Sequence, residues 1–187
     1  EYLTPGEERC NLEGLNIDKA TEVDSFVSTN ASNKQEEAEL WVEISKKAFL
    51  ESDISRWEED GEIKWGFDER KGRLVIKGKR PLEDYTDGSK TCQMKDYHFD
   101  EAPWGRKYGK QIKSVVVCHG VSSIGVYAFY LCENLKSVLL TNSVTSIKYC
   151  AFSRCSRLKY IMIPNSVTSI GKHAFAGCES LETIVIP

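Results

Sequence analysis

The sequence has no long hydrophobic run. The roughly 18 consecutive apolar residues that a membrane-spanning helix requires occur nowhere in it. The first twenty residues lack the apolar core of a secretory signal, although a signal removed before Glu1 would leave no trace. Glycine-rich phosphate loops, zinc-finger spacings and recognisable carboxylate pairs are also missing. We therefore expect no membrane span, no metal or other cofactor, and no catalytic activity.

The composition is that of a folded protein, with charge distributed unevenly along the chain. Of the 187 residues, 41% are hydrophobic and 28% are charged. Residues 1–60 hold 16 acidic and 6 basic residues, residues 61–105 hold 9 of each, and residues 106–187 hold 3 acidic and 10 basic residues. Either the two ends of the chain attract one another or the basic end meets an acidic partner. We expect no nucleic-acid partner.

Seven cysteines form no simple disulfide framework, because the count is odd and the chain is long. Cys132, Cys155 and Cys178 are evenly spaced along the chain, which makes them members of a repeat. A buried free cysteine behaves as a small apolar group, so we expect these three to be structural. The sequence leaves the pairing state of four cysteines open: Cys10, Cys92, Cys118 and Cys150.

Three units of equal length follow one another without an insertion, and a fourth begins. They read IKSVVVCHGVSSIGVYAFYLCEN from Ile112, LKSVLLTNSVTSIKYCAFSRCSR from Leu135, LKYIMIPNSVTSIGKHAFAGCES from Leu158 and LETIVIP from Leu181. The period of about 23 residues predicts a solenoid, as periods between about 20 and 50 residues do. One unit cannot bury enough apolar surface to fold alone, so stacking must supply the remaining stability.

Stacking predicts that equivalent residues form columns. Side chains alternate along a strand, and in each unit one set continues inward through the Ala-Phe pair. We therefore expect Phe129, Phe152 and Phe175 to lie in one buried column. The other set and the neighbouring lysines should face outward and form a binding surface: Lys113, Ser114, Val116, Lys136, Ser137, Leu139, Lys159, Tyr160 and Met162. An exposed apolar row of this kind indicates either a partner that covers it or merely the preference of strands for branched residues.

The pattern L-x-x-I-x-I-P-x-S-V-T-S-I-G-x-x-A-F-x-x-C resembles the BspA-type, or treponemal-type, leucine-rich repeat throughout residues 112–187. Cys118 and Thr141 depart from it where Pro164 fits, and Lys148 replaces a glycine. The resemblance implies a secreted or cell-surface recognition protein that binds a protein or glycan and is not an enzyme.

Residues 61–105 predict a cap for the first unit. Ile63, Trp65 and Phe67 alternate on one strand and Leu74 and Ile76 on the return strand, which is typical of a β-hairpin. The stretch GEIKWGFDERKGRLVIKG is similar to a module that precedes the repeats in bacterial members of the same family. We expect Trp104 to pack against the first unit.

Residues 1–60 predict two helices. The first should run from Asp18 to Val27 and the second from about 33 to 50, with Ser32 and Gln35 as its capping box. We expect this helical pair to dock on the cap through Trp41 and Phe49. The fold class is thus α+β, with a helical segment (1–60), a hairpin cap (61–105) and a short leucine-rich-repeat solenoid (106–187).

Two further groups of residues could carry chemistry. Tyr127, Cys150 and His173 occupy one position of the unit, and a thiol beside an imidazole is the minimum for a nucleophilic pair. Nothing supplies an orienting group, so we expect an ordinary exposed column. Arg73, Lys77 and Lys79 would share one strand face and could bind a polyanion, but edge strands also carry such charges to prevent aggregation.

The function predicted from the sequence is recognition or adhesion through the exposed strand face. One alternative is a structural role, with self-association at an uncapped C-terminal end near Pro187. The other is a polyanion-binding surface protein that uses the row Lys113, Lys136 and Lys159.

Overall fold

The computed structural model describes residue 12 and residues 14–79, 91–98 and 102–185. The helices in this part of the chain are α1 (Ala20–Asn30), α2 (Lys34–Leu50) and α3 (Pro103–Tyr108). The strands before the repeat units are β1 (Trp57–Asp60), β2 (Ile63–Asp68), β3 (Arg73–Gly78) and β4 (Cys92–Gln93). The strands within the units are β5 (Ser114–Val117), β6 (Val121–Ile124), β7 (Ser137–Leu140), β8 (Ser146–Ile147), β9 (Tyr160–Met162), β10 (Ser169–Ile170) and β11 (Thr183–Val185).

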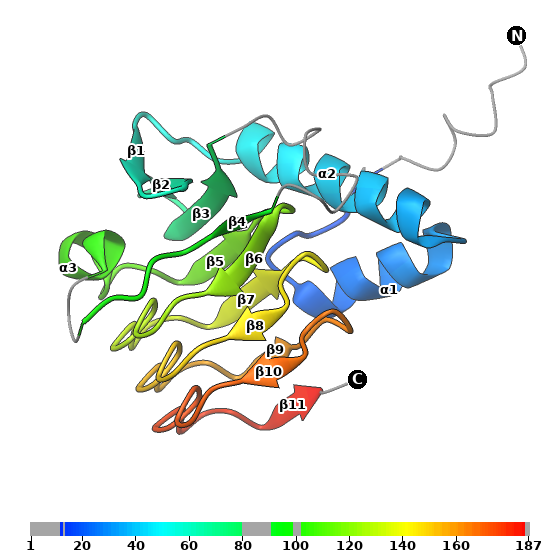
Figure 1. The fold of residues 1–187 in the computed structure, drawn as a ribbon. Coiled ribbons are helices and arrows are strands. Elements are labelled where there is room, and N and C mark those ends of the chain that lie inside the picture. The colour runs from blue at the N-terminus through cyan, green and yellow to red at the C-terminus, as the bar shows by residue number, and fades with distance from the viewer. Residues whose placement is uncertain (1–11, 13, 80–90, 99–101, 186–187) are drawn as a thin grey trace, which may run out of the picture.

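The repeat strands stack in parallel, and each residue pairs with its equivalent in the next unit. Ser114 pairs with Ser137, Ser146 with Ser169, and the backbones of residues 160 and 183 pair in the same way. The strands form a five-stranded sheet in the order β1-β2-β3-β5-β7, a four-stranded sheet β10-β8-β6-β4, and the pair β11-β9. Figure 1 shows the units lying one below another. The described part of the chain therefore combines three helices with mainly parallel sheets, in agreement with the expected α+β class.

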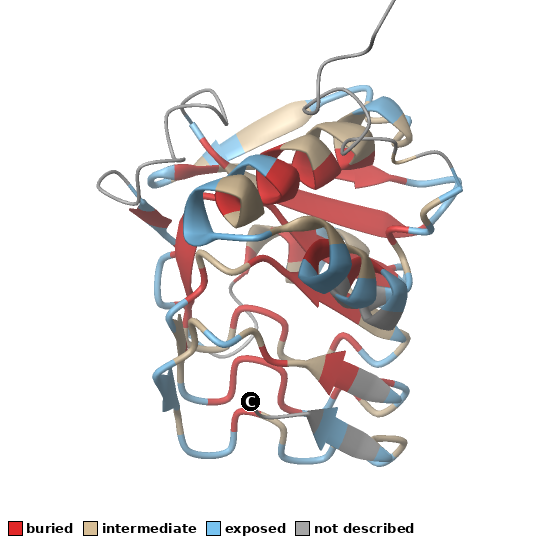
Figure 2. Ribbon diagram, turned by 90° about the vertical axis from the view of Figure 1, so that its right-hand side faces the viewer, coloured by how far each residue is buried: buried red, intermediate tan, exposed pale blue. Residues whose placement is uncertain are grey.

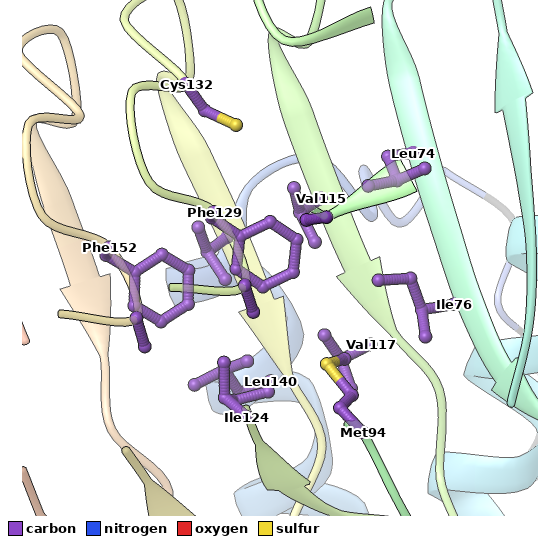
Figure 3. Close-up of a cluster of buried hydrophobic side chains, with 14 of the residues drawn as sticks. Leu74, Ile76, Met94, Val115, Val117, Ile124, Phe129, Cys132, Leu140 and Phe152 are labelled. Atoms are coloured by element: carbon purple, nitrogen blue, oxygen red, sulfur yellow. The ribbon is translucent and has the colours of Figure 1, made fainter. Parts of the chain in front are cut away.

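The main core fills the space between the two layers of strands. Phe129 and Phe152 stack with ring centroids 5.0 Å apart, and Phe152 and Phe175 stack at 5.6 Å. Both interplanar angles are small, at 14° and 3°. Figure 3 shows Phe129 and Phe152 side by side among the aliphatic side chains of the strands. The predicted phenylalanine column is thus confirmed.

The predicted hairpin is also confirmed, and it extends the repeat sheet. Trp65 pairs with Ile76 and Phe67 with Leu74 across antiparallel β2 and β3. β3 then pairs in parallel with β5, which joins the hairpin to the first unit by main-chain hydrogen bonds. Trp104 is fully buried, as expected, and its Nε1–H donates to the Ala128 carbonyl at 2.7 Å. β1 belongs to the segment 1–60 but pairs with β2 of the cap. The predicted boundary between the helical segment and the cap, after residue 60, therefore falls within one sheet.

Both predicted helices are present, but the cap of the second is not Ser32. The Asn33 side chain accepts hydrogen bonds from the Gln35 and Glu36 amides, and the Glu36 carboxylate accepts one from the Ser32 amide. The capping arrangement is therefore shifted by one residue from S-x-x-Q. Asparagine and serine are equally good N-cap residues, so residue type alone does not decide whether Ser32 or Asn33 caps the helix.

The helices cover the outer face of the sheet, which we expected to be exposed. Val75, Val116 and Leu139 form one buried cluster with residues of α1 and α2, including Val27 and Trp41. Val116 is 1% and Leu139 is 4% exposed. Figure 2 shows the two helices lying across the front of the strands. The expected docking on the cap is present where Lys77 of β3 lies over the ring of Phe49. The two helices also extend beyond the cap and cover Val116 and Leu139 of the repeat strands.

Arg73, Lys77 and Lys79 do not form a free basic surface, so the structure does not favour the polyanion alternative for this face. Arg73 is 2% exposed and donates through Nε to Asp18 at 2.9 Å, which anchors the segment before α1 to β3. Lys77 lies over the rings of Phe49 and Trp57. Lys79 forms an ion pair with Glu59 at 2.9 Å.

Phe152→Ala tests the phenylalanine column. Its ring lies between those of Phe129 and Phe175, so truncation leaves a cavity that neither neighbour can fill. We expect the free energy of unfolding to fall by about 3 to 5 kcal/mol in urea denaturation. Lys172→Ala, at an exposed position, should change it by less than about 0.5 kcal/mol. A loss below about 1 kcal/mol for Phe152→Ala would contradict the stacking.

Leu139→Asp tests the helix cover. On an open strand face this substitution would leave stability nearly unchanged. Beneath α1 and α2 it buries an unpaired carboxylate, which costs about 3 kcal/mol or more in unfolding free energy. Met162→Asp, at the equivalent but half-buried position of the next unit, is the matched control and should cost less. Equal and small losses in urea denaturation would show that the helices do not cover Leu139.

Candidate functional site

The structure separates the residues predicted to form a strand-face site. Ser114, Val116 and Leu139 are buried and therefore unavailable to a partner, which corrects the prediction for these three. Ser137 and Met162 are half-buried, and the side chain of Tyr160 lies outside the described residues. Lys113, Lys136 and Lys159 are exposed. Among the side chains of the predicted surface that the structure describes, the three lysines are the exposed ones.

The turns of the units present a different row of side chains. Tyr127, Cys150 and His173 each have a positive φ, of 54°, 51° and 59°. Four residues later a second left-handed position recurs, at Leu131, Arg154 and Gly177. Residues other than glycine enter this region at a cost of about 1 to 2 kcal/mol each, so the surrounding structure must compensate for the strain.

That compensation comes from main-chain hydrogen bonds between the turns of successive units. The Phe129 amide donates to the Ala151 carbonyl at 2.7 Å, and the Phe152 amide donates to the Ala174 carbonyl at 2.8 Å. The Arg154 amide donates to the Ala176 carbonyl at 2.7 Å in the same way. Each turn is thereby held against the next, and the side chains on the turns are held in place.

Three tyrosines and one histidine form a continuous aromatic row on these turns. Tyr127 meets Tyr130 edge to face at 5.4 Å and Tyr149 at 5.5 Å, and Tyr149 meets His173 at 5.9 Å. Tyr149 is 41% exposed. The four rings border a groove of about 840 Å³ that we call the turn groove. It is completed by Leu131, Glu133, Cys150, Ser153, Arg154, Ser156, Ala176, Gly177 and Glu179.

The turn groove combines aromatic surface with both signs of charge. Glu133, Arg154 and Glu179 line it together with serine hydroxyls. Hydrogen bonding with Cys150, and then with Tyr127, raises the pKa of the Tyr149 hydroxyl to about 12. The phenol is protonated at physiological pH, as an ordinary tyrosine is, and its hydroxyl is already engaged by these two neighbours.

The Cys150 and His173 pair does not form the exposed column that we expected. Cys150 is 7% exposed, whereas His173 is exposed and its ring packs against Tyr149. In the described ranges, no group of three or more His, Cys, Asp or Glu side chains could hold a metal ion. No helix there is long and apolar enough to cross a membrane.

The cysteine column lies in the core. Cys132 and Cys155 are fully buried, and the Cys155 and Cys178 thiols donate to the carbonyls of Phe129 and Phe152. Burial raises the pKa of Cys132 to about 12 and raises that of Cys155. Cys178 is half-buried, and its hydrogen bond with Cys155 lowers its pKa.

The repeat pattern of the sequence does not predict the tyrosine row, because the row does not recur at equivalent positions of the units. Tyr130 and Tyr149 stand at positions where the other units carry different residues, so periodicity does not single them out. A count of aromatic residues at the turns would have been a usable signal, since three of the eight tyrosines lie between residues 127 and 149.

Thiol labelling tests the assignment of the cysteine column to the core. With iodoacetamide at pH 8, we expect Cys178 in the native chain to react at least about tenfold faster than Cys132, because the thiolate is the nucleophile. Mass spectrometry of the digested chain measures each rate. In concentrated urea the two rates should converge. Equal rates in the native chain would show that Cys132 is accessible.

Residues 107–187 match the family described as BspA type Leucine rich repeat region (6 copies), and the match covers less than half of the chain. The stacked units of this part of the chain are thus similar to BspA-type leucine-rich repeats. Regions of this type are generally protein-interaction or adhesion modules and are typically not enzymes. No curated protein is significantly similar to the chain.

Several bacterial leucine-rich repeat structures are similar to the chain. One from Eubacterium ventriosum is 25% identical, with a TM-score of 0.45 over 68% of this chain and 42% of that one. A leucine rich repeat protein of T. pallidum is 22% identical, with a TM-score of 0.38 over 71% and 72%. A leucine rich cell surface protein of Faecalibacterium prausnitzii is 18% identical, with a TM-score of 0.28 over 71% and 55%. The chain therefore spans less than half of the Eubacterium protein.

Proposed function

We propose that this chain is a non-enzymatic recognition module that binds a protein or glycan through the turn groove. The observation that carries the proposal is the aromatic row of Tyr127, Tyr130, Tyr149 and His173, held in edge-to-face contact beside an open groove. The strand face, where the sequence pointed, is covered by α1 and α2 over the first two units.

Tyrosine suits such a site for two physical reasons. Its ring supplies a large contact area with only two rotatable bonds, so little side-chain entropy is lost on binding. Its hydroxyl remains polar, so the groove can be solvated when empty and can hydrogen-bond a ligand when filled. Here the rings already pack against one another, so less ordering remains to be done when a ligand binds.

The register of the strands supports the finer description of the architecture. Because each strand residue pairs with its equivalent one unit further along, we infer a short solenoid with a repeat of about 23 residues over residues 106–187. Residues 61–105 then act as its hairpin cap and residues 1–60 as its helical cover. A secreted or cell-surface location is part of the proposal, and the BspA-type repeat region supports it.

A second candidate is a polyanion-binding role for the lysine row. Lys113, Lys136 and Lys159 are exposed, and no described carboxylate lies within ion-pairing distance of them. The described acidic residues of the first sixty that form ion pairs do so within that segment, as Glu43 does with Lys46, or with residues 64–107, as Glu58 does with Lys107 at 2.8 Å. Much of the positive charge of the repeat region therefore faces solvent, and like charges in a row favour an anionic partner.

Binding of the full chain to an array of matrix proteins and glycans tests both candidates. We expect Tyr149→Ala to weaken capture at least about tenfold, as a central aromatic contact does, without lowering the melting temperature. Leu50→Ala, at a side chain 88% exposed at the end of α2, is the matched surface control and should bind like the wild type.

A double variant, Lys136→Ala with Lys159→Ala, separates the two candidates. If it loses capture while Tyr149→Ala retains it, and if affinity falls steeply with salt, the lysine row is the site and the turn groove is not. If neither change affects capture, both proposals are wrong.

A further inference from the structure

The turn groove carries most of the acidic side chains of the repeat region. Residues 106–187 contain 10 basic residues but only 3 acidic ones, which are Glu133, Glu179 and Glu182. Two of the three, Glu133 and Glu179, line the turn groove, where the one basic residue is Arg154. Figure 1 shows the tight turns of the units at the edge of the stack opposite α1 and α2. A net negative charge is therefore concentrated at one place on an otherwise basic region.

The two carboxylates of the groove form no ion pair inside the protein. In the part of the chain that the structure describes, no basic group lies within ion-pairing distance of Glu133 or Glu179. Arg154 packs instead beside Gly177, where an added Cβ would meet the arginine Cγ at 3.3 Å. Both glutamates are exposed, and they occupy equivalent positions two units apart, about 9 to 10 Å along the stack. Their charge is therefore available to a ligand that lies along the groove.

Tyr149 offers an aromatic surface in the unit between the two glutamates. Its ring makes perpendicular contacts with Tyr127 and His173, at interplanar angles of 90° and 84°, and the residue is still 41% exposed. Hydrogen bonds with Cys150 and Tyr127 engage its hydroxyl, so the ring is what remains for a ligand. Among the described residues no cation lies over this ring, whereas Lys77 lies over two other aromatic rings.

An aromatic ring near carboxylates is suited to an organic cation. The face of the ring is electron-rich and attracts positive charge, and a carboxylate adds a charged hydrogen-bond acceptor. Among the cationic groups of proteins the guanidinium of arginine fits both, because it is planar enough to stack and its forked N–H groups match a carboxylate. A neutral glycan would leave both carboxylates unused. The basic surroundings disfavour a highly basic ligand, so a single arginine is favoured over a run of them.

We propose that the turn groove binds a protein segment through one arginine side chain, whose guanidinium lies over the Tyr149 ring and pairs with the carboxylate of Glu133 or Glu179. Arg154 and the serine hydroxyls of the groove then donate hydrogen bonds to the main-chain carbonyls beside that arginine. The inference rests on the proposed function, because it names the ligand of the same groove, and it selects a protein over a glycan.

Titration of the full-length chain with a short peptide tests the arginine. The probe is Ac-Gly-Ser-Arg-Ser-Gly-NH₂, and its matched control carries citrulline, which has nearly the same shape but no charge. In ¹H–¹⁵N spectra we expect the backbone amide signals of Tyr149 and Arg154 to move saturably with the arginine peptide. The citrulline peptide should bind at least about tenfold more weakly, because it loses the charged hydrogen bond and the attraction to the ring.

A double variant, Glu133→Gln with Glu179→Gln, removes both charges at exposed positions without changing side-chain length. We expect its affinity for the arginine peptide to fall at least about fivefold, and that of Tyr149→Ala to fall as well. Glu182→Gln is the matched control, since it removes the third acidic side chain of the repeat region, which is exposed but does not line the groove. This control should bind like the wild type.

Three results would overturn the inference: no response to the arginine peptide at millimolar concentration, equal binding of the citrulline peptide, or an unchanged affinity in the double variant. If capture on the array of proteins and glycans still depended on Tyr149, the turn groove would remain the site, with a neutral ligand. If Tyr149→Ala changed neither array capture nor peptide binding, the groove would not be the site and the proposed function would fail as well.

Discussion

In-register stacking of the units is the constraint on which the rest of the structure depends. Phe152 has no complete environment within its own unit, because its two ring faces are covered by Phe129 before it and Phe175 after it. The same holds for the backbone, since the turn amides find their acceptors one unit further along the chain. A unit is therefore stable only as a member of the stack, and any shift in register would break the core contacts and the turn ladder together.

The same stacking makes strained turns tolerable. Leu131, Arg154 and the other left-handed residues would be unfavourable in an isolated turn. They persist because the hydrogen bonds of the ladder fix the backbone on both sides. This constraint places the side chains at the first left-handed position, Tyr127, Cys150 and His173, at one edge at regular intervals. The backbone geometry thus fixes the spacing of this column, while Tyr130 and Tyr149, which complete the aromatic row, stand at neighbouring positions of the turns.

Much of the repeat architecture could be predicted because it depends on residues that recur at short, regular intervals in the sequence. The phenylalanine column, the alternation of Trp65 and Phe67 and the burial of Trp104 all follow from patterns within a few residues or from one fixed interval. Periodicity could not predict that the helices cover the strand face, because Val116 and Trp41 belong to one buried cluster but lie far apart in the sequence. The continuous apolar runs of β5 and β7 carried a usable signal, since strands buried on both faces lose the alternation of polar and apolar residues. Arg73 shows the same limit, because its partner Asp18 lies 55 residues away.

Covering the strand face with the chain's own helices has a consequence for recognition. A leucine-rich repeat sheet usually offers its parallel columns as one broad surface, but here Val116 and Leu139 are already occupied by α1 and α2. In the proposed function, contact with a partner is therefore made at the margins of the stack. At one margin the turns carry the aromatic row, and at the other the helices leave a cleft against Asn142 and Met162. The helical pair is therefore both a structural cover and one wall of this cleft. Because Arg73 and Asp18 join the segment before α1 to the hairpin, the cover is held by the same sheet that it protects.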